Sequence, residues 1–411
     1  MPETLVIVGA NLTGGGAAAT LREEGFDGRV VLIGAEPRAP YERPPLSKQY
    51  LRGESSFEQS LVQSPDYYGE NGIETRFGVR ATRVHAAERV VELESGERVS
   101  YDKLLIATGG RIRRFPIPGL DLHSVYDLRT VDDCDRIRAE STPGRRAVVV
   151  GMGFIGSEVA ASLRQLGVEV VAVERDPVPL RRVLGEEVGR VMAGIHRDHG
   201  ATLIFDDTVA AFEGEGRRVG RVRTGHGRLI ECDFVVMGLG IEPVTELLAD
   251  TGVEIDNGIV VDEYCRTGVE GIYAAGDVAN HYHPVFDRRI RVEHWQNALK
   301  QGPAAARSML GKGGPYDEVP WFWSDQYDYN LQYAGYHTEW DELVVRGSTE
   351  ERNFVAFYRK GGRVLAAVAV NRGRDLRRSM RLIKAQRPVD TTKLRDPDVD
   401  LRTLVEAADA R

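Results

Sequence analysis

The glycine-rich stretch Gly151-Met152-Gly153-Phe154-Ile155-Gly156 decides the fold of this chain. The apolar run Ala147–Val150 precedes it, and a helix-forming segment, Glu158–Leu166, follows it. Glycines at these three positions between a strand and a helix give a tight turn, let a pyrophosphate approach the backbone, and let the helix pack closely on the strand. The positive end of the helix then faces the phosphates. We therefore predict a dinucleotide-binding unit here.

A carboxylate at the end of the next strand bears on which nicotinamide nucleotide this unit takes. Glu174 follows the apolar run Val168–Val173 at about the 20-residue spacing of a residue that holds an adenosine ribose. A carboxylate there repels a 2′-phosphate, which favours NADH over NADPH. Arg182, with Arg175 and Arg181 nearby, keeps the NADPH alternative open, because a guanidinium can accept that phosphate.

The beginning of the chain repeats the same order of elements. The runs Leu5–Val8 and Val30–Ile33 predict strands, with a helix expected over Ala17–Glu24 between them. The turn Gly9-Ala10-Asn11-Leu12-Thr13-Gly14 keeps the first and last glycines of the fingerprint but has Asn11 in place of the middle one. Its side chain occupies space that the pyrophosphate should approach. Glu36 follows the second strand at near-fingerprint distance and predicts a ribose contact.

Further strands are expected between and after these two units, and the composition changes beyond a glycine-rich linker at Gly311–Pro315. We predict an α/β protein with two Rossmann-like, glutathione-reductase-type nucleotide-binding domains and a small α+β carboxy-terminal domain. The expected division is an FAD domain in two segments (1–110 and 239–313), an inserted NAD(H) domain (111–238) and a carboxy-terminal domain (314–411).

Length, charge and hydropathy exclude several classes of protein. A chain of 411 residues can form two or three domains, and a net charge of −8 argues against nucleic-acid binding. No run approaches the roughly 18–20 apolar residues that cross a bilayer. Met1–Thr4 leads directly into an apolar strand without the basic flank of a signal peptide. We expect a cytoplasmic protein without membrane contact, either a monomer or a weak homodimer.

The cysteines and histidines offer no obvious reactive or metal site. Cys134, Cys232 and Cys265 lie far apart and in no Cys-x-x-Cys spacing, so structural roles are expected. The sequence around His281 and His283 lacks a carboxylate or cysteine at a ligand spacing. We predict no metal ion.

Several longer motifs carry a family resemblance over nearly the whole chain. The chain resembles the ferredoxin-reductase branch of the FAD-dependent pyridine nucleotide-disulfide oxidoreductases. The motifs are Tyr41-Glu42-Arg43-Pro44-Pro45-Leu46-Ser47-Lys48, Leu105-Ile106-Ala107-Thr108-Gly109-Gly110, Gly156-Ser157-Glu158-Val159-Ala160, Tyr273-Ala274-Ala275-Gly276-Asp277-Val278-Ala279, Glu293-His294-Trp295-Gln296-Asn297-Ala298 and Val319-Pro320-Trp321-Phe322-Trp323-Ser324-Asp325-Gln326.

The resemblance implies the cofactors FAD and NADH and a set of residues around them. It places Lys48 beside the isoalloxazine, Asp277 near the ribityl chain and Glu158 near the nicotinamide carboxamide, with Lys48 and Glu158 as catalytic residues. A helix beginning near Trp295 could direct its positive end to the flavin pyrimidine ring. The complete set of expected cofactor contacts is Gly9, Asn11, Gly14, Glu36, Arg43, Lys48, Val84, Ala107, Thr108, Gly109, Arg129, Gly151, Gly153, Ile155, Gly156, Glu158, Glu174, Arg182, Gly240, Asp277 and Trp295.

The electron acceptor follows from a missing thiol. The segment Pro44–Lys48 contains no cysteine to face the flavin, so a thiol-based acceptor step is not expected. The expected function is NADH-dependent reduction of a [2Fe–2S] ferredoxin that feeds a cytochrome P450 or a Rieske dioxygenase. Basic residues of the carboxy-terminal segment offer an acidic ferredoxin a surface, or form an ordinary solvated helix face; they are Arg374, Arg377, Arg378, Arg381 and Lys384.

Two alternatives stay open at this stage. One is an NADH oxidase or peroxidase, against which the cysteine-free segment argues. The other is an NADH-binding signalling flavoprotein of the apoptosis-inducing-factor type. The sequence names neither the partner ferredoxin nor the terminal oxygenase.

Overall fold

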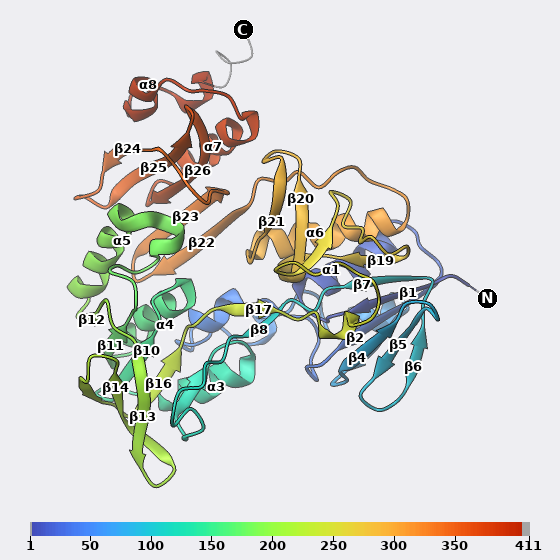
Figure 1. Ribbon diagram of the computed structural model, residues 1–411, viewed down its shortest axis with the longest axis horizontal. Helices are drawn as coiled ribbons and strands as arrows, with labels where there is room; N and C mark the ends of the chain where they lie inside the picture. Colours follow the sequence, from blue (N-terminus) through green and yellow to red (C-terminus); the bar gives the residue numbers. More distant parts are fainter. Residues whose placement is uncertain (1, 405–411) are drawn as a thin grey trace. The chain divides into compact units, whose positions relative to one another are not determined.

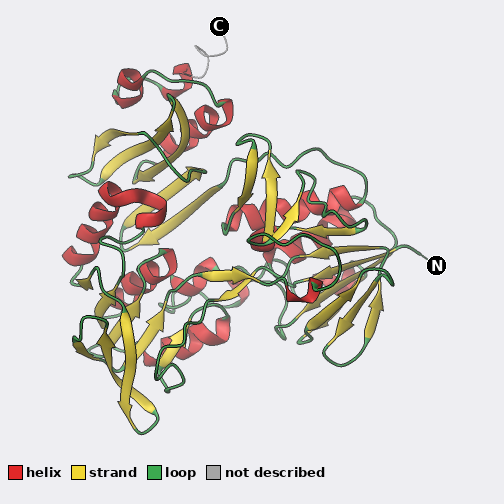
Figure 2. Ribbon diagram, viewed as in Figure 1, coloured by secondary structure: helices red, strands yellow, loops and turns green. Residues whose placement is uncertain are grey.

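The computed structural model describes residues 2–404, which form two compact units (Figure 1). Unit 1 comprises residues 2–42, Ser60–Arg111 and Glu242–Phe322, and unit 2 comprises Arg43–Gln59, Ile112–Ile241 and residues 323–404. The chain passes between the units after Glu42, Gln59, Arg111, Ile241 and Phe322; the third and fourth passages lie in β8 (Gly110–Ile112) and β17 (Ile241–Pro243). Figure 2 shows that each unit contains both helices and sheets.

A parallel sheet of order β19-β7-β1-β2-β3 forms the centre of unit 1. Its strands are β1 (Thr4–Val8), β2 (Arg29–Gly34), β3 (Ile73–Phe77), β7 (Lys103–Ile106) and β19 (Ile272–Ala274). Leu5 and Ile7 point to one face, where they pack with residues of α1 (Leu12–Glu23) and α6 (Trp295–Met309). Val6 and Val8 point to the other face, toward an antiparallel layer. Because both faces are covered, the strand is apolar throughout rather than alternating.

The remaining elements of unit 1 are small. They are the antiparallel layer of β4 (Ala81–His85), β5 (Val90–Leu93) and β6 (Arg98–Ser100), the group of β18 (Ile259–Val261), β20 (Ala279–His283) and β21 (Arg288–Arg291), α2 (Tyr67–Glu70), and the 3-10 turns η3 (Glu246–Leu248) and η4 (Gly276–Val278).

Unit 2 contains a second parallel sheet, of order β12-β11-β10-β16-β9. Its strands are β9 (Val125–Asp127), β10 (Arg146–Val150), β11 (Glu169–Val173), β12 (Thr202–Ile204) and β16 (Phe234–Met237). The other elements are α3 (Val131–Glu140), α4 (Phe154–Gln165), α5 (Arg181–Asp198), the 3-10 turns η1 (Pro44–Ser47) and η2 (Glu58–Ser60), and the antiparallel strands β13 (Val209–Glu215), β14 (Arg218–Thr224) and β15 (Leu229–Glu231).

An antiparallel sheet of order β22-β23-β26-β25-β24 follows near the end of the chain. Helix α7 packs on this sheet through Leu376, Leu382 and Ile383, which are all buried. The elements are β22 (Trp321–Gln326), β23 (Tyr329–Gly335), β24 (Glu342–Ser348), β25 (Asn353–Lys360), β26 (Arg363–Val370), α7 (Gly373–Ala385) and α8 (Thr391–Arg395).

The predicted α/β class, with two parallel nucleotide-binding sheets and a carboxy-terminal α+β part, is confirmed. Two helices begin earlier than expected, because in each the glycine-rich turn already forms the first helical turn. Helix α1 begins at Leu12, five positions before Ala17, and α4 begins at Phe154, four positions before Glu158. The division into four sequence segments stays a prediction. Across residues 2–404, the structure contains no helix with the length and apolar character needed to span a membrane.

Candidate nucleotide-binding and redox site

Asn11 caps helix α1. Its Oδ1 accepts hydrogen bonds from the main-chain N–H groups of Thr13 at 3.0 Å and Gly14 at 3.3 Å, and its Nδ2 donates to the carbonyl of Ala107 at 2.6 Å. A side-chain oxygen in this position satisfies N–H groups that the first turn of a helix leaves unpaired. The middle position of the first fingerprint therefore holds a carboxamide that already uses two of the amides at the positive end of α1.

The other two glycines of this turn fit the fingerprint. Gly9 has φ of +120°, which L side chains rarely adopt. A Cβ on Gly14 would lie 1.9 Å from the carbonyl oxygen of Gly9, so helix and turn pack too closely for any side chain. The geometry therefore explains why both positions of the fingerprint are glycine.

The carboxyl ends of β1, β7 and β19 bring three expected segments to one edge of the unit 1 sheet, because the strands are parallel neighbours. Gly9, Ala107 and Asp277 lie at this edge, as does Gly276, whose N–H donates to Oε1 of Gln301 at 2.8 Å. The Nε2 of Gln301 is buried without a hydrogen-bond partner among the described residues. A buried amide donor of this kind is expected to meet a polar ligand. The edge fits a bound dinucleotide.

The remaining expected residues of unit 1 have these surroundings. Glu36 follows β2 and accepts a 2.5 Å hydrogen bond from the hydroxyl of Tyr41. Thr108 donates to the carbonyl of Val244 at 2.7 Å. Val84 packs its side chain into the apolar core, which leaves its main chain for any ligand contact.

Trp295 begins helix α6 and lies beside Glu42. Burial raises the pKa of the Glu42 carboxyl, and the hydrogen bond from Trp295 works against that rise. Gly109, at the end of the same strand segment as Thr108, has φ of +66° and so needs to be glycine.

The second fingerprint leaves the start of its helix open. Gly153 is the N-cap residue of α4, no side chain caps the helix, and a Cβ on Gly153 would meet nothing within 4 Å. A Cβ on Gly156 would lie 1.9 Å from the carbonyl oxygen of Gly151, as at the equivalent place in the first unit. Ile155, in the first turn, is 43% exposed although apolar. The amino terminus of α4 therefore has no side-chain cap, so it can offer main-chain N–H groups and the apolar side chain of Ile155 to a ligand.

Glu174 lies next to this turn. Its Oε2 accepts a hydrogen bond from the N–H of Met152 at 2.6 Å and its Oε1 accepts one from Asp176 at 3.0 Å. Arg182, which was expected to bind a nucleotide, lies 3.7 Å from the carboxylate of Asp176. Arg181 lies 3.8 Å from the same carboxylate. A negative charge already faces each of these guanidinium groups.

Lys48 and Glu158 form a buried ion pair in unit 2. The Nζ of Lys48 lies 2.6 Å from Oε2 of Glu158, and their side chains are 5% and 4% exposed. The hydroxyl of Ser47 donates to the same carboxylate oxygen at 2.5 Å, and the hydroxyl of Ser324 donates to Oε1 at 2.7 Å. The hydroxyl of Ser162 on α4 donates to the carbonyl of Ser47 at 2.7 Å, which fixes η1 against this helix. The Glu158 carboxylate thus accepts from two hydroxyls and one ammonium group.

Three other expected residues also belong to unit 2. Arg43 donates a hydrogen bond to the carbonyl of Arg129, directly before η1. The carbonyl of Gly240 accepts from the N–H of Arg113 at 3.0 Å, and Gly240 has φ of +82° with open space where a Cβ would be. The expected contacts thus fall on both units, and their roles stay predictions.

The cysteines do not form a redox centre in the part of the chain that the structure describes. Cys134, Cys232 and Cys265 are free and buried, and burial raises the pKa of each thiol to about 12. Thiolate is the reactive form, so these groups are inert near neutral pH. No cluster of three or more potential metal ligands occurs within residues 2–404.

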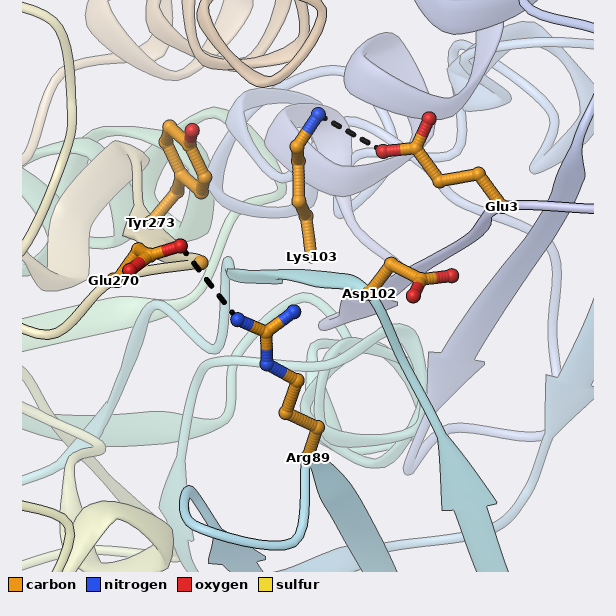
Figure 3. A pocket seen from close by; sticks show the side chains of 7 residues that line it. Glu3, Arg89, Asp102, Lys103, Glu270 and Tyr273 are labelled. Atoms are coloured by element: carbon orange, nitrogen blue, oxygen red, sulfur yellow. Dashed lines mark ion pairs between the residues drawn. The ribbon is translucent and has the colours of Figure 1, made fainter.

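A surface hollow lies at the opposite edge of the unit 1 sheet (Figure 3). It surrounds the beginnings of β1 and β7, where Lys103 pairs with Glu3 at 2.9 Å, and it includes a 3.6 Å pair between Arg89 and Glu270. Ligands of open α/β sheets bind outside the carboxyl ends of the strands. The hollow is therefore not the dinucleotide site; its two cations face three carboxylates.

Sequence reasoning missed the serines around Glu158 and the residues beyond them. Ser324 and Gln326 occupy the buried face of β22, whose side chains alternate between partly buried and fully buried positions. Two polar residues at i and i+2 on a buried strand face were the available signal, because buried polar groups need partners. Glu158, which accepts from Ser324, lies 166 positions before it and could not be found by spacing.

Comparison with known protein families identifies the family to which this chain belongs. Residues 3–302 match the pyridine nucleotide-disulphide oxidoreductase family. The chain belongs to that family. Residues 321–405 match the reductase C-terminal family, which corresponds to the antiparallel sheet of β22–β26 with α7 and α8. Members of the pyridine nucleotide-disulphide oxidoreductase family that resemble this chain use FAD and NAD(P)H.

Individual family members match over almost their whole length. The chain is 39% identical over 404 residues to the 5,5'-dehydrodivanillate O-demethylase ferredoxin reductase subunit of Sphingobium sp., covering 98% of both chains. It is 37% identical to rhodocoxin reductase of Rhodococcus erythropolis, covering 98% of this chain and 94% of that protein. The covalent putidaredoxin reductase–putidaredoxin complex matches with a TM-score of 0.96 at 35% identity, covering 100% and 99% of the two chains.

These matches confirm the predicted resemblance to the ferredoxin-reductase branch of this family. They also confirm that the chain is an FAD-dependent NAD(P)H oxidoreductase.

Proposed function

We propose that this protein oxidises NADH and passes the electrons one at a time to a [2Fe–2S] ferredoxin, which feeds a cytochrome P450 or a Rieske dioxygenase. The observation that carries the proposal is the cysteine-free segment Pro44–Lys48, in which Ser47 and Lys48 contact Glu158. With no thiol there, and with the three cysteines buried elsewhere, electrons have no disulfide to enter. They leave to an external carrier, and full-length relatives are named as ferredoxin reductases.

FAD supplies the chemistry that connects a hydride donor to a single-electron acceptor. The overall reaction converts one NADH and two oxidised ferredoxins to NAD⁺, two reduced ferredoxins and one proton. Gly9, Ala107, Gly276 and Asp277 would hold FAD at the carboxyl edge of the unit 1 sheet. The phosphates of FAD would contact the amino terminus of α1, where the Asn11 side chain already accepts hydrogen bonds from two main-chain N–H groups.

The nicotinamide nucleotide would bind at the open end of α4. Gly151, Gly153 and Gly156 let the pyrophosphate approach unpaired helix amides, and the positive end of the helix dipole attracts it. Glu174 would bind the adenosine ribose and repel a 2′-phosphate, which selects NADH. Arg182 supports NADPH less well, since Asp176 already faces its guanidinium.

Lys48 and Glu158 would orient the reacting rings. Two serine hydroxyls and an ammonium hold the Glu158 carboxylate in one position, so the carboxylate is preorganised rather than mobile. The pair excludes water from its surroundings, because both side chains are almost fully buried. In this arrangement Glu158 would position the carboxamide end of the nicotinamide, and Lys48 would contribute positive charge beside the flavin.

The cytoplasm is the compartment that this proposal requires. The three cysteines are free, as expected for a protein in a reducing compartment, where NADH is also produced. We infer a monomer or a weak homodimer in solution.

Steady-state turnover with different acceptors tests the proposal. FAD-loaded protein is mixed with NADH and one of three acceptors: a [2Fe–2S] ferredoxin, oxygen or hydrogen peroxide. The acceptors are used at about equal concentrations, and the rate of NADH consumption is measured from the absorbance at about 340 nm. Ferredoxin should support turnover at least about tenfold faster than the other two acceptors. Fast peroxide or oxygen turnover with a silent ferredoxin would instead establish the oxidase or peroxidase alternative.

A further inference from the structure

A chain of buried polar side chains runs from Glu158 into β22 and α5. The hydroxyl of Ser324 lies 2.7 Å from Oε1 of Glu158, and Nε2 of Gln326 lies 3.0 Å from that hydroxyl. The Oε1 of Gln326 lies 3.0 Å from Nε2 of His196, and Nδ1 of His196 lies 3.1 Å from the hydroxyl of Tyr327. Ser324, Gln326 and His196 are all 0% exposed. No water is needed to connect these groups.

The charge on Glu158 fixes the direction of every bond in this chain. An ionised carboxylate only accepts, so Ser324 must donate its single hydroxyl hydrogen to Glu158. Ser324 can then only accept from the amide N–H of Gln326, which turns the amide oxygen toward His196. The His196 ring must therefore carry its proton on Nε2, and its Nδ1 accepts from the hydroxyl of Tyr327. All donors point toward the carboxylate.

The protonation states of the other members agree with this direction. Burial lowers the pKa of His196 to about 4, so the ring is neutral at pH 7 and carries one proton. Burial raises the pKa of Tyr327, which therefore keeps its hydroxyl hydrogen. The charged or titratable groups that face the chain include Lys48 at Glu158, Arg164 near Tyr327, and His199, which stacks on Tyr327 at 3.8 Å and lies 3.6 Å from Asp328.

We propose that Ser324, Gln326 and His196 are positioning residues that hold the Glu158 carboxylate in its orientation, and that the tautomer of His196 reports the charge on Glu158. Hydrogen bonds aligned in one direction polarise one another, so the chain strengthens the last bond, from Ser324 to the carboxylate. The effect of this chain on the reaction rate rests on the proposed role of Glu158. The directions of its hydrogen bonds do not depend on that role.

Removing the charge should reverse the chain. In Glu158→Gln, the carboxamide oxygen should face Lys48 and Ser47, which both donate, and its NH₂ group should face Ser324. Ser324 must then accept from it and donate to Gln326, whose amide turns over. Its NH₂ group donates to Nε2 of His196, and the ring proton moves to Nδ1, from which it donates to Tyr327. A nearly isosteric change at residue 158 thus changes the tautomer at residue 196.

Nitrogen NMR of the histidine rings tests this reversal in the full-length, FAD-loaded protein. The His196 signals are assigned from their loss in His196→Asn. The wild type should carry the ring proton on Nε2, and Glu158→Gln should carry it on Nδ1. An Nδ1 proton in the wild type, or the same tautomer in both proteins, overturns the inference.

Ser324→Ala supplies the matched control, because it interrupts the chain and leaves its two ends in place. In that background, Glu158→Gln should leave the His196 tautomer unchanged; a change would show that Glu158 acts on His196 by another route and would overturn the inference.

Kinetics of Ser324→Ala separate the inference from the proposed function. Loss of one charge-assisted donor should lower kcat for NADH oxidation by about tenfold with little change in KM, because the carboxylate is held less firmly. An unchanged kcat beside the expected tautomer switch would leave the chain established and overturn the proposed role of Glu158 in the reaction.

Discussion

The Nζ atom of Lys48 lies 2.6 Å from Oε2 of Glu158, although 110 positions separate the two residues in the sequence. Two oppositely charged side chains are here taken out of water together. Breaking such a pair leaves one buried charge without a partner, which costs more than the pair itself contributes.

Lys48→Met should therefore lower the free energy of unfolding by about 3–5 kcal/mol. The double variant Lys48→Met with Glu158→Gln should recover part of this loss, because no unpaired charge remains. Denaturant unfolding of all four proteins in the cycle measures the coupling. Arg190→Ala is the control: its partner Glu186 lies at 2.9 Å on the same helix, but their side chains are 66% and 42% exposed, so the change should stay below about 0.5 kcal/mol. Strictly additive effects of the two buried substitutions would contradict the account.

Asn11→Gly should increase the occupancy of FAD. The substitution removes the carboxamide that uses the N–H groups of Thr13 and Gly14, and glycine at an N-cap costs the helix only a few tenths of a kcal/mol. The flavin-to-protein ratio after purification measures this effect. Full and equal occupancy in both proteins would show that Asn11 does not weaken FAD binding.

The reciprocal change tests the same idea in the other unit. Gly153→Asn introduces a carboxamide at the open N-cap of α4, where a Cβ meets nothing within 4 Å. It should cap α4 as Asn11 caps α1, and weaken NADH binding by about tenfold, since the pyrophosphate loses helix amides. NADH titration gives the affinity, and an affinity equal to that of the wild type would argue against competition between cap and phosphate.

Glu174→Gln should reduce the preference for NADH. The neutral amide no longer repels a 2′-phosphate, so the ratio of kcat/KM for NADPH to that for NADH should rise by about tenfold. Glu186→Gln is the control. Glu186 also contacts an arginine of this region, Arg181, but both residues belong to α5 and not to the turn at the end of β11. A ratio that changes equally in both variants would assign the effect to net charge rather than to the ribose site.

Helix α7 carries a basic face that should recruit ferredoxin. Arg374, Arg377, Arg381 and Lys384 are exposed and recur at helical spacing, opposite the buried Leu376 and Leu382. Arg377→Glu with Arg381→Glu should lower the association rate with an acidic ferredoxin by about tenfold at low salt and flatten its salt dependence.

The reduction of FAD by NADH should not change in this double variant. Arg217→Glu, at the exposed turn after β13, provides the control for a charge change elsewhere on unit 2. Equal losses in the control and in the α7 variant would place the ferredoxin surface elsewhere.

His281 should make the protein sensitive to acid. Burial, with smaller effects from His283 and Arg289, lowers its pKa to about 3 in the folded protein, against 6.5 for an unperturbed ring. The unfolded chain therefore binds more protons between these values, and stability falls as pH falls below about 6.5, by up to about 1.4 kcal/mol per pH unit for this residue.

His281→Leu should flatten this dependence between about pH 6 and pH 4, because the residue that must stay neutral is gone. Urea unfolding at several pH values measures the slope. His226→Gln, whose side chain is 68% exposed, should leave the slope as it is. A slope unaffected by His281→Leu would mean that this histidine does not contribute to acid unfolding.

The local patterns predicted the fold well because strands and glycine turns depend on neighbours in sequence. The spacing of Gly151, Gly153 and Gly156 fixes a turn that the structure reproduces, and the apolar run Leu5–Val8 becomes a strand buried on both faces. The sequence pattern predicts starts of α1 and α4 that are too late, because it assigns both glycine-rich segments to turns. Asn11 in fact provides the cap that starts α1.

The surroundings of Glu158 could not be predicted, because they depend on contacts over long separations. Ser324 comes from a strand that follows Glu158 by 166 positions, and His196 joins it only through Gln326. No periodicity relates these residues. The family resemblance identified Lys48 and Glu158, but only the folded chain shows what holds the carboxylate.

The most direct test of the central claim is an anaerobic titration that counts electrons. A small amount of NADH is added to FAD-loaded protein with an excess of oxidised [2Fe–2S] ferredoxin, and the absorbance of flavin and cluster is recorded together. The account predicts that two clusters are reduced for each NADH and that the flavin returns to its oxidised form. Flavin that stays reduced beside oxidised clusters would contradict it.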